Sequence, residues 1–142
     1  MRHRKNTFKL NRNPSHRRCL IANMLKDLIV KERIETTVPK AKFLKKAADK
    51  MITLAKKRDL ASRRRAIAQL MIRFNKLTSK EAREVKEGNT SALNNDRLVI
   101  GKLFDELGQR FAQREGGYTR LIRTRRRSGD NAEMCYLEYL SE

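Results

Sequence analysis

The sequence predicts a single α/β domain of the α+β type, in which helices in one layer cover one face of a small three-stranded mixed sheet. Three observations support this fold class. Apolar residues recur at helical spacing in several separate segments. β-Branched and alternating residues are confined to one short stretch after the first helix and one long stretch near the C-terminus. The 142-residue length suits one modest core.

The predicted order is helix, strand, three or four helices, then two strands, preceded by an extended basic N-terminal arm. The arm, residues 1–14, reads "MRHRKNTFKLNRNP" and has neither periodicity nor an acidic residue. In isolation such a segment is disordered. Ser15 is a candidate cap for a first helix that runs to about Glu32, so the domain occupies residues 15–142.

The next elements follow from local signals. The alternating stretch "RIETTV" predicts a short strand. Pro39 fits the first turn of a second helix, with Thr36 or Thr37 as its cap. Asp59 is a candidate cap for a third helix, "LASRRRAIAQLMIRF". Its apolar residues are expected to pack inward up to Phe74, with Met71 among them.

Residues 75–95 form the most acidic and least apolar part of the chain and are expected to be an exposed excursion. Thr78 and Glu81 have capping-box spacing within it, and Gly88 ends any helix there. A further helix is predicted from Asn95 or Asp96, with apolar residues at helical spacing as far as Phe111.

The C-terminal stretch "YTRLIRTRRRSGDNAEMCYLEYL" predicts a hairpin whose tip carries a cluster of arginines, after the break at Gly116-Gly117. Leu121, Leu137 and Cys135 are expected to anchor the hairpin to the helices. Asp130 is expected to organise the turn through an Asx-type hydrogen bond.

The charge of the chain points to a polyanionic partner. Lysine and arginine number 35 against 16 acidic residues, a formal net charge of +19. Folding does not need this excess, because self-repulsion opposes a compact state. Arginine supplies 20 of the 35 cations, which favours phosphate recognition by its planar fork. Nucleic acid and an anionic membrane surface are the two common partners of such a surface.

Several other classes of protein are disfavoured. No apolar run approaches the roughly 20 residues that span a bilayer, and we expect neither a secretory signal nor membrane binding. A mitochondrial transit peptide would also lack acids, but this N-terminus is Asn-rich and Ser-poor. Cys19 and Cys135 give no disulfide framework and fit a reducing cytosol.

The sequence offers little to an enzyme. His3 and His16 are the only histidines, and neither has a nearby acid in sequence to orient it as a base. A zinc site from both histidines and both cysteines would lack the usual paired ligands such as C-x-x-C. No phosphate-binding glycine motif is present. The sequence therefore predicts no catalysis, no metal, no cofactor and no small-molecule substrate.

Six motifs then carry a resemblance to a known family. "MRHRK", "LNRNPSHR", "RIETTVPKAKFLKK", "MITLAKK", "KLFDELGQRFAQREGGYTR" and "SGDNAEMCYLEYL" appear in this order over nearly the whole chain. Together they resemble the bacterial large-subunit ribosomal protein number seventeen family. The chain departs from the family pattern in three places: residues 75–95 are longer, the glycine before "RSGD" is missing, and Glu133 replaces a common proline.

The resemblance implies a single α/β domain that binds large-subunit (23S) rRNA near the polypeptide exit. It also implies neighbouring large-subunit ribosomal proteins as partners, one copy per ribosome, and a cytoplasmic location. By resemblance, the RNA contacts fall on the N-terminal motifs, the "PKAK" helix start and the "GGYTR" hairpin, and the other basic clusters add to them. Phe8 and Tyr118 could stack on bases, although Tyr118 could equally pack at the hairpin base. The expected rRNA-binding residues are Arg2, His3, Arg4, Lys5, Lys9, Asn11, Arg12, Asn13, Ser15, His16, Arg17, Arg18, Lys40, Lys42, Arg63, Arg64, Arg65, Arg114, Tyr118, Thr119, Arg120, Arg123, Arg125, Arg126 and Arg127.

Two alternatives stand beside this hypothesis. The charge alone would also fit a nucleic-acid chaperone or a nucleoid-type DNA-binding protein. A small nuclease or RNA-modifying enzyme would need a carboxylate cluster or a Cys–His site that the residues do not supply.

Overall fold

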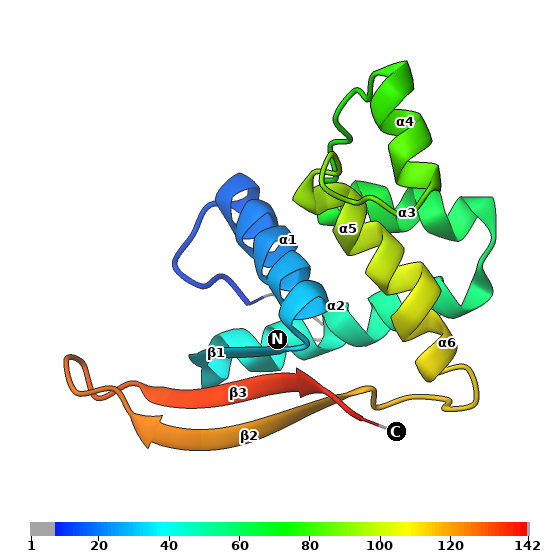
Figure 1. The fold of residues 1–142 in the computed structure, drawn as a ribbon. Helices are drawn as coiled ribbons and strands as arrows, with labels where there is room; N and C mark the ends of the chain where they lie inside the picture. Colours follow the sequence, from blue (N-terminus) through cyan, green and yellow to red (C-terminus); the bar gives the residue numbers. More distant parts are fainter. Residues whose placement is uncertain (1–7, 142) are drawn as a thin grey trace.

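The structure, a computed structural model, describes residues 8–141, so residues 1–7 of the predicted arm lie outside the described part (Figure 1). Its elements follow the predicted order. They are α1 (Pro14–Lys31), β1 (Arg33–Thr37), α2 (Val38–Lys57), α3 (Leu60–Leu70), α4 (Ser79–Lys86), α5 (Asn95–Gly101), a π-helical segment (Lys102–Leu107), α6 (Gly108–Arg110), β2 (Thr119–Arg126) and β3 (Glu133–Tyr139).

The three strands form one sheet in the order β1-β3-β2, and both neighbouring pairs are antiparallel. The expectation of a mixed sheet is therefore wrong. The hairpin sets the direction of β3 against β2, and β1 joins the free edge of β3, again running opposite to it. The pattern of β1 in the sequence shows that it is a strand but not which way its partner runs, because several helices separate the two.

The core lies between the helices and one face of the sheet (Figure 1). Cys135 and Leu137 of β3 are fully buried, and Leu121 of β2 packs partly against the same cluster, as predicted for the hairpin anchors. Buried residues follow α2 at steps of three and four, from Ala41 to Ala55. At Gly108, a Cβ would lie only 3.2 Å from the carbonyl oxygen of Ala55, so this glycine permits a close approach to α2.

Three of the four predicted N-caps hold that position, and two of these form a side-chain capping bond. Asp59 accepts a hydrogen bond from the Ser62 amide at 2.9 Å, and Thr78 forms the predicted capping box with Glu81. Ser15 is not the cap of α1, because Asn13 holds that place and accepts from the His16 amide at 2.8 Å. At α2, Thr37 occupies the N-cap position without a side-chain capping bond.

The third helix ends four residues earlier than predicted, at Leu70. Met71 takes a left-handed conformation with φ of 52°, and the chain then runs on without helical structure. Met71 and Phe74 are 41% and 43% exposed, so their expected inward packing is wrong.

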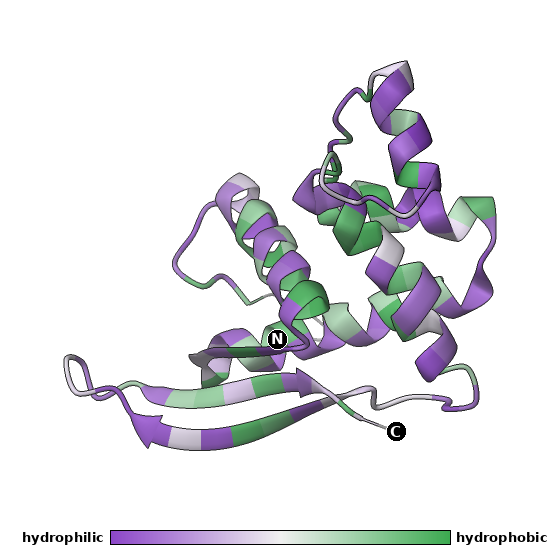
Figure 2. Ribbon diagram, in the orientation of Figure 1, coloured by the Kyte–Doolittle hydropathy of each residue, from purple (hydrophilic) through white to green (hydrophobic). Residues whose placement is uncertain are grey.

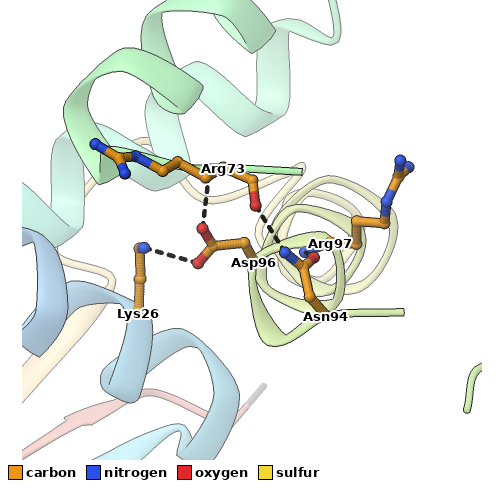
Figure 3. A network of polar contacts seen from close by, with 5 residues as sticks. All are labelled: Lys26, Arg73, Asn94, Asp96 and Arg97. Atoms are coloured by element: carbon orange, nitrogen blue, oxygen red, sulfur yellow. Dashed lines mark hydrogen bonds and ion pairs between the residues drawn. The ribbon is translucent and has the colours of Figure 1, made fainter. Parts of the chain in front are cut away.

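A polar network explains why the chain leaves the helix there (Figure 3). The Asp96 carboxylate accepts from the Arg73 amide at 2.6 Å and from Lys26 of α1 at 2.7 Å. Asn94 donates to the Arg73 carbonyl oxygen at 2.6 Å. Burial works against the charged form of Asp96, but these donors outweigh it and lower its pKa. The network fastens the chain after α3 to the start of α5.

The segment between these fastened points projects from the fold. Helix α4 has no buried residue and is mostly hydrophilic (Figure 2), and it extends away from the sheet (Figure 1). The side chain of Arg97 donates to the carbonyl oxygen of Asn75 at 2.8 Å and lies over the Phe74 ring. The excursion is therefore clamped at its base and exposed along its helix.

Candidate nucleic-acid interface

Three parts of the chain that are far apart in the sequence meet at one side of the molecule: Phe8, the start of α2 and the hairpin. We call this the arm–hairpin surface, made of Phe8, residues 37–46 and residues 123–133. A groove of about 690 Å³ lies within it, lined by Phe8, by Val38, Pro39, Lys40 and Lys42 at the start of α2, and by Arg123 and Arg127 of the hairpin. The hairpin tip extends beyond the helices at this end (Figure 1).

The first described residues form a turn, so this part of the predicted arm is not extended. Leu10 and Asn11 have φ of 54° and 50°, and the Arg12 amide donates to the Lys9 carbonyl oxygen at 3.2 Å. Arg12 contacts the His16 ring at 3.1 Å, and Arg17 donates to the Arg12 carbonyl oxygen at 3.4 Å. Lys9, Arg12 and Arg18, together with Ser15 and His16, are exposed.

The cations at the start of α2 have no acidic partner within the described chain. Lys40 is half-buried and Lys42 is exposed, and neither forms an ion pair with a residue between 8 and 141. Their charges are therefore available to a polyanion from outside.

The hairpin tip is organised by Asp130, as predicted. Its carboxylate accepts from the Ala132 amide at 3.2 Å and from the Arg127 guanidinium at 2.8 and 2.5 Å. The bond from Arg127, followed by that from Ala132, lowers the pKa of Asp130 to about 2. Asn131 supplies the left-handed residue, with φ of 53°, so the turn does not depend on the missing glycine.

The other hairpin arginines lack such a partner. A register shift between Arg123 and Arg126 inserts an extra residue into β2, and such a bulge redirects the side chains around it. Arg123, Arg125 and Arg126 are exposed, and none forms an ion pair with an acid of the described chain. Arg120 is exposed as well, on the opposite face of β2 from Leu121.

Two of the predicted rRNA-binding residues are buried in the protein. Tyr118 is only 3% exposed, and its ring packs against Phe111 at 5.3 Å between centroids. The packing role is therefore correct for Tyr118, and base stacking is not available to it. Thr119 is also buried and donates to Asp49 at 3.0 Å. Arg114 folds back to donate to the Gly116 carbonyl oxygen, which shapes the loop before β2.

The remaining predicted residues lie elsewhere. Arg63, Arg64 and Arg65 are exposed on α3, which Figure 1 places away from the hairpin tip. Arg63 lies 5.8 Å from the ring centre of Phe104. Arg2, His3, Arg4 and Lys5 fall outside the described residues.

Two residues of the surface were missed from the sequence. Phe43 and Lys46 line a second hollow of about 570 Å³ together with Phe8, Pro39 and Lys42. Lys46 follows Lys42 by one helical turn, so the spacing of the lysines held the signal for it. Nothing in the sequence placed Phe43 beside Phe8, where the ring centroids are 6.4 Å apart.

The described residues do not gather ligands for a metal. Between residues 8 and 141, no three His, Cys, Asp or Glu side chains come close enough to hold an ion. The Cys135 thiol is buried, which raises its pKa, and it donates to the Thr36 carbonyl oxygen at 3.4 Å. No helix in this range is long and apolar enough to cross a membrane. What the surface can do chemically is bind anions.

Comparison with known proteins identifies the family. The model of the family described as Ribosomal protein L17 matches residues 20–140. Over 142 residues and 100% of both chains, the sequence is 67% identical to the large ribosomal subunit protein bL17 of Protochlamydia amoebophila (strain UWE25). The proteins of the same name from Chlamydia pneumoniae and Chlamydia caviae are 61% and 59% identical, over 99% and 100% of each chain. This is a family of structural ribosomal proteins and not of enzymes. The chain therefore belongs to the ribosomal protein L17 family.

Proposed function

We propose that this chain, a structural constituent of the large ribosomal subunit, binds and stabilises folded 23S rRNA through the arm–hairpin surface. The observation that carries the proposal is the convergence of Lys40, Lys42 and Arg123 on one groove without an acidic partner in the described chain. Arginine and lysine side chains that face solvent in this way fix a protein on phosphate oxygens.

The hairpin and the groove contact phosphates in different ways. Arg125 and Arg126 project at the tip, where planar guanidinium groups can grip two phosphate oxygens each. The ammonium groups of Lys40 and Lys42 act as point charges over the groove. Arg64 and Arg65 on α3 are a second contact region for the same RNA, because folded rRNA can reach more than one side of a small protein.

The resemblance supports the proposed location, and the names of the relatives support only the large subunit. We propose that the protein lies near the polypeptide exit, beside neighbouring large-subunit ribosomal proteins, in one copy per cytoplasmic ribosome. We also propose that residues 15–142 form a single domain, preceded by the basic arm of residues 1–14 and interrupted by the excursion of residues 75–95.

The salt dependence of binding tests the RNA-binding proposal. With roughly eight phosphate contacts, the affinity of the full chain for transcribed 23S rRNA should fall by about three to five orders of magnitude between ~50 and ~200 mM salt. Filter binding measures it. An affinity insensitive to salt would contradict the proposal.

Sedimentation separates this function from a nucleoid-type DNA-binding role, which the net charge alone also fits. The ribosomal role predicts that the protein migrates with large subunits after a moderate salt wash. It also predicts that duplex DNA competes poorly against 23S rRNA. Equal competition by DNA, with recovery of the protein in the nucleoid fraction, would favour the alternative.

A further inference from the structure

The groove of the arm–hairpin surface offers apolar area that phosphate contacts do not use. Phe8 is a large apolar side chain that remains 43% exposed there, and Pro39 is exposed beside it. Phe8, Pro39 and Lys42 line both hollows, of about 690 and 570 Å³, so the two hollows adjoin at these residues. Each hollow lies within the range of ~300–1,000 Å³ typical of small-ligand sites.

The charge around this apolar area is mostly positive. Lys40, Lys42, Lys46, Arg123 and Arg127 border the two hollows. Asp130 and Glu133 are the acids that line them, and Asp130 is already engaged by Arg127. The pattern is an aromatic and aliphatic floor with a cationic rim.

We propose that this groove takes one unpaired nucleotide extruded from a 23S rRNA helix, with the base against Phe8 and its phosphates on Lys40, Lys42 and Arg123. The inference rests on the proposed RNA-binding function and names the part of the RNA that this site holds. A planar base matches the exposed ring, since stacking on aromatic side chains is the common way in which proteins hold unpaired bases.

A nucleotide fits these features better than an acidic peptide does. Carboxylate side chains would use the cationic rim but leave the exposed Phe8 ring and Pro39 without a flat partner. A nucleotide carries the flat apolar face and the negative charge in one unit, a few ångströms apart. The ring of Phe43, tilted by 32° to that of Phe8, adds a second aromatic wall.

An oligonucleotide without bases separates the contribution of base contacts from that of phosphate contacts. The full chain is titrated with fluorescein-labelled hexauridylate and with a hexamer of the same backbone that carries no bases, and anisotropy gives both affinities. Both probes have the same phosphates, so only base contacts can separate them. We expect hexauridylate to bind about tenfold more tightly than the abasic hexamer.

Three variants locate the effect. Phe8→Ala should remove most of the preference for the hexamer with bases and leave abasic binding unchanged. Phe74→Ala is the matched control, since Phe74 is also 43% exposed but lies beyond α3. It should leave both affinities as they are. Phe8→Trp should keep the preference. Because the chain has no other tryptophan, the fluorescence of this variant reports position 8 alone. Hexauridylate should quench it, and the abasic hexamer should not.

The outcomes separate this inference from the proposed function. Equal binding of both hexamers, or a preference that survives Phe8→Ala, would overturn the nucleotide groove. If 23S rRNA still bound with a steep salt dependence in that case, the RNA-binding proposal would stand without it. If the unmodified chain did not bind 23S rRNA at all, the RNA-binding proposal itself would be wrong, whatever the hexamers show.

Discussion

At the scale of single residues, Glu32 joins parts of the fold that are distant in sequence. It ends α1 with φ of 59°, and its carbonyl oxygen accepts from the Tyr139 amide at 2.9 Å. Its carboxylate accepts from Arg110 at 2.5 Å and from Lys102 at 2.8 Å. The hydrogen bond from Arg110 is the main cause that lowers the pKa of Glu32 to about 2; burial opposes it, and Lys102 adds to the lowering.

Replacing this carboxylate should cost stability in a pH-dependent way. A pKa lowered from 4.5 to about 2 stabilises the fold fully above pH 4.5, and this contribution disappears as the pH falls toward 2. Full conversion of that shift gives about 3 kcal/mol, which solvent screening at the partly exposed side chain reduces to about 1 to 2 kcal/mol. Glu32→Gln should therefore lower the free energy of unfolding by that amount at pH 7 and by little at pH 2.

Urea unfolding at both pH values measures the difference. Glu115→Gln, in the exposed loop before β2, is the control for removing one carboxylate and should have little effect at either pH. A gap between the Glu32 variant and the unmodified chain that stayed the same at pH 2 would contradict the assigned ion pairs.

At the scale of elements, the sequence was informative where the signal is local. Asp59 and the Thr78–Glu81 pair were readable as caps because a capping bond spans only three residues. The end of α3 was not readable, because the acceptor for the Arg73 amide is Asp96, 23 positions away. The π-helical segment Lys102–Leu107 was equally hidden, since its apolar spacing also fits an α-helix.

The interface shows the same division. Its cations other than Lys46 were predicted from composition and clustering, and Asp130 was predicted from turn chemistry. The burial of Tyr118 against Phe111, the bulge in β2 and the contact between Phe8 and Phe43 all depend on tertiary packing. The sequence therefore predicts which residue types form such a surface, but it does not predict the shape of the groove between them.

The start of α1 offers a direct test of one corrected element. Asn13 accepts from the His16 amide, whereas Ser15 lies in the first turn and is exposed. Asn13→Ala should lower the free energy of unfolding by about 1 kcal/mol, the usual loss for a capping side chain. Ser15→Ala should change it by less than about 0.5 kcal/mol. Denaturant unfolding of the two variants compares them, and a larger loss for Ser15→Ala would return the cap to that residue.

At the scale of the whole molecule, apolar packing and charge are kept apart. The core between the helices and the sheet holds no lysine or arginine, judged over residues 8–141, and the cations cover the outside. Exposed arginines are present on the hairpin and on α3, at different ends of the molecule (Figure 1). This distribution would let the proposed RNA partner contact the protein at both ends.

Charge removal at three places should distinguish this arrangement from an effect of net charge. Arg125→Ala with Arg126→Ala at the hairpin, and Arg64→Ala with Arg65→Ala on α3, each remove two exposed cations. Each pair should make the plot of log affinity for 23S rRNA against log salt shallower by about two, since one phosphate contact contributes about 0.9. The four changes together should add, because the sites are distant.

Lys80→Ala with Lys86→Ala is the matched control for that experiment. These lysines are exposed on α4, outside the proposed contacts, and their removal changes the net charge by the same amount. Filter binding should show an unchanged salt slope for this pair, and thermal unfolding should show that all three pairs keep the fold, since surface changes of this kind alter stability little. The same loss of slope from all three pairs would mean that binding follows total charge, and the localised interface would be wrong.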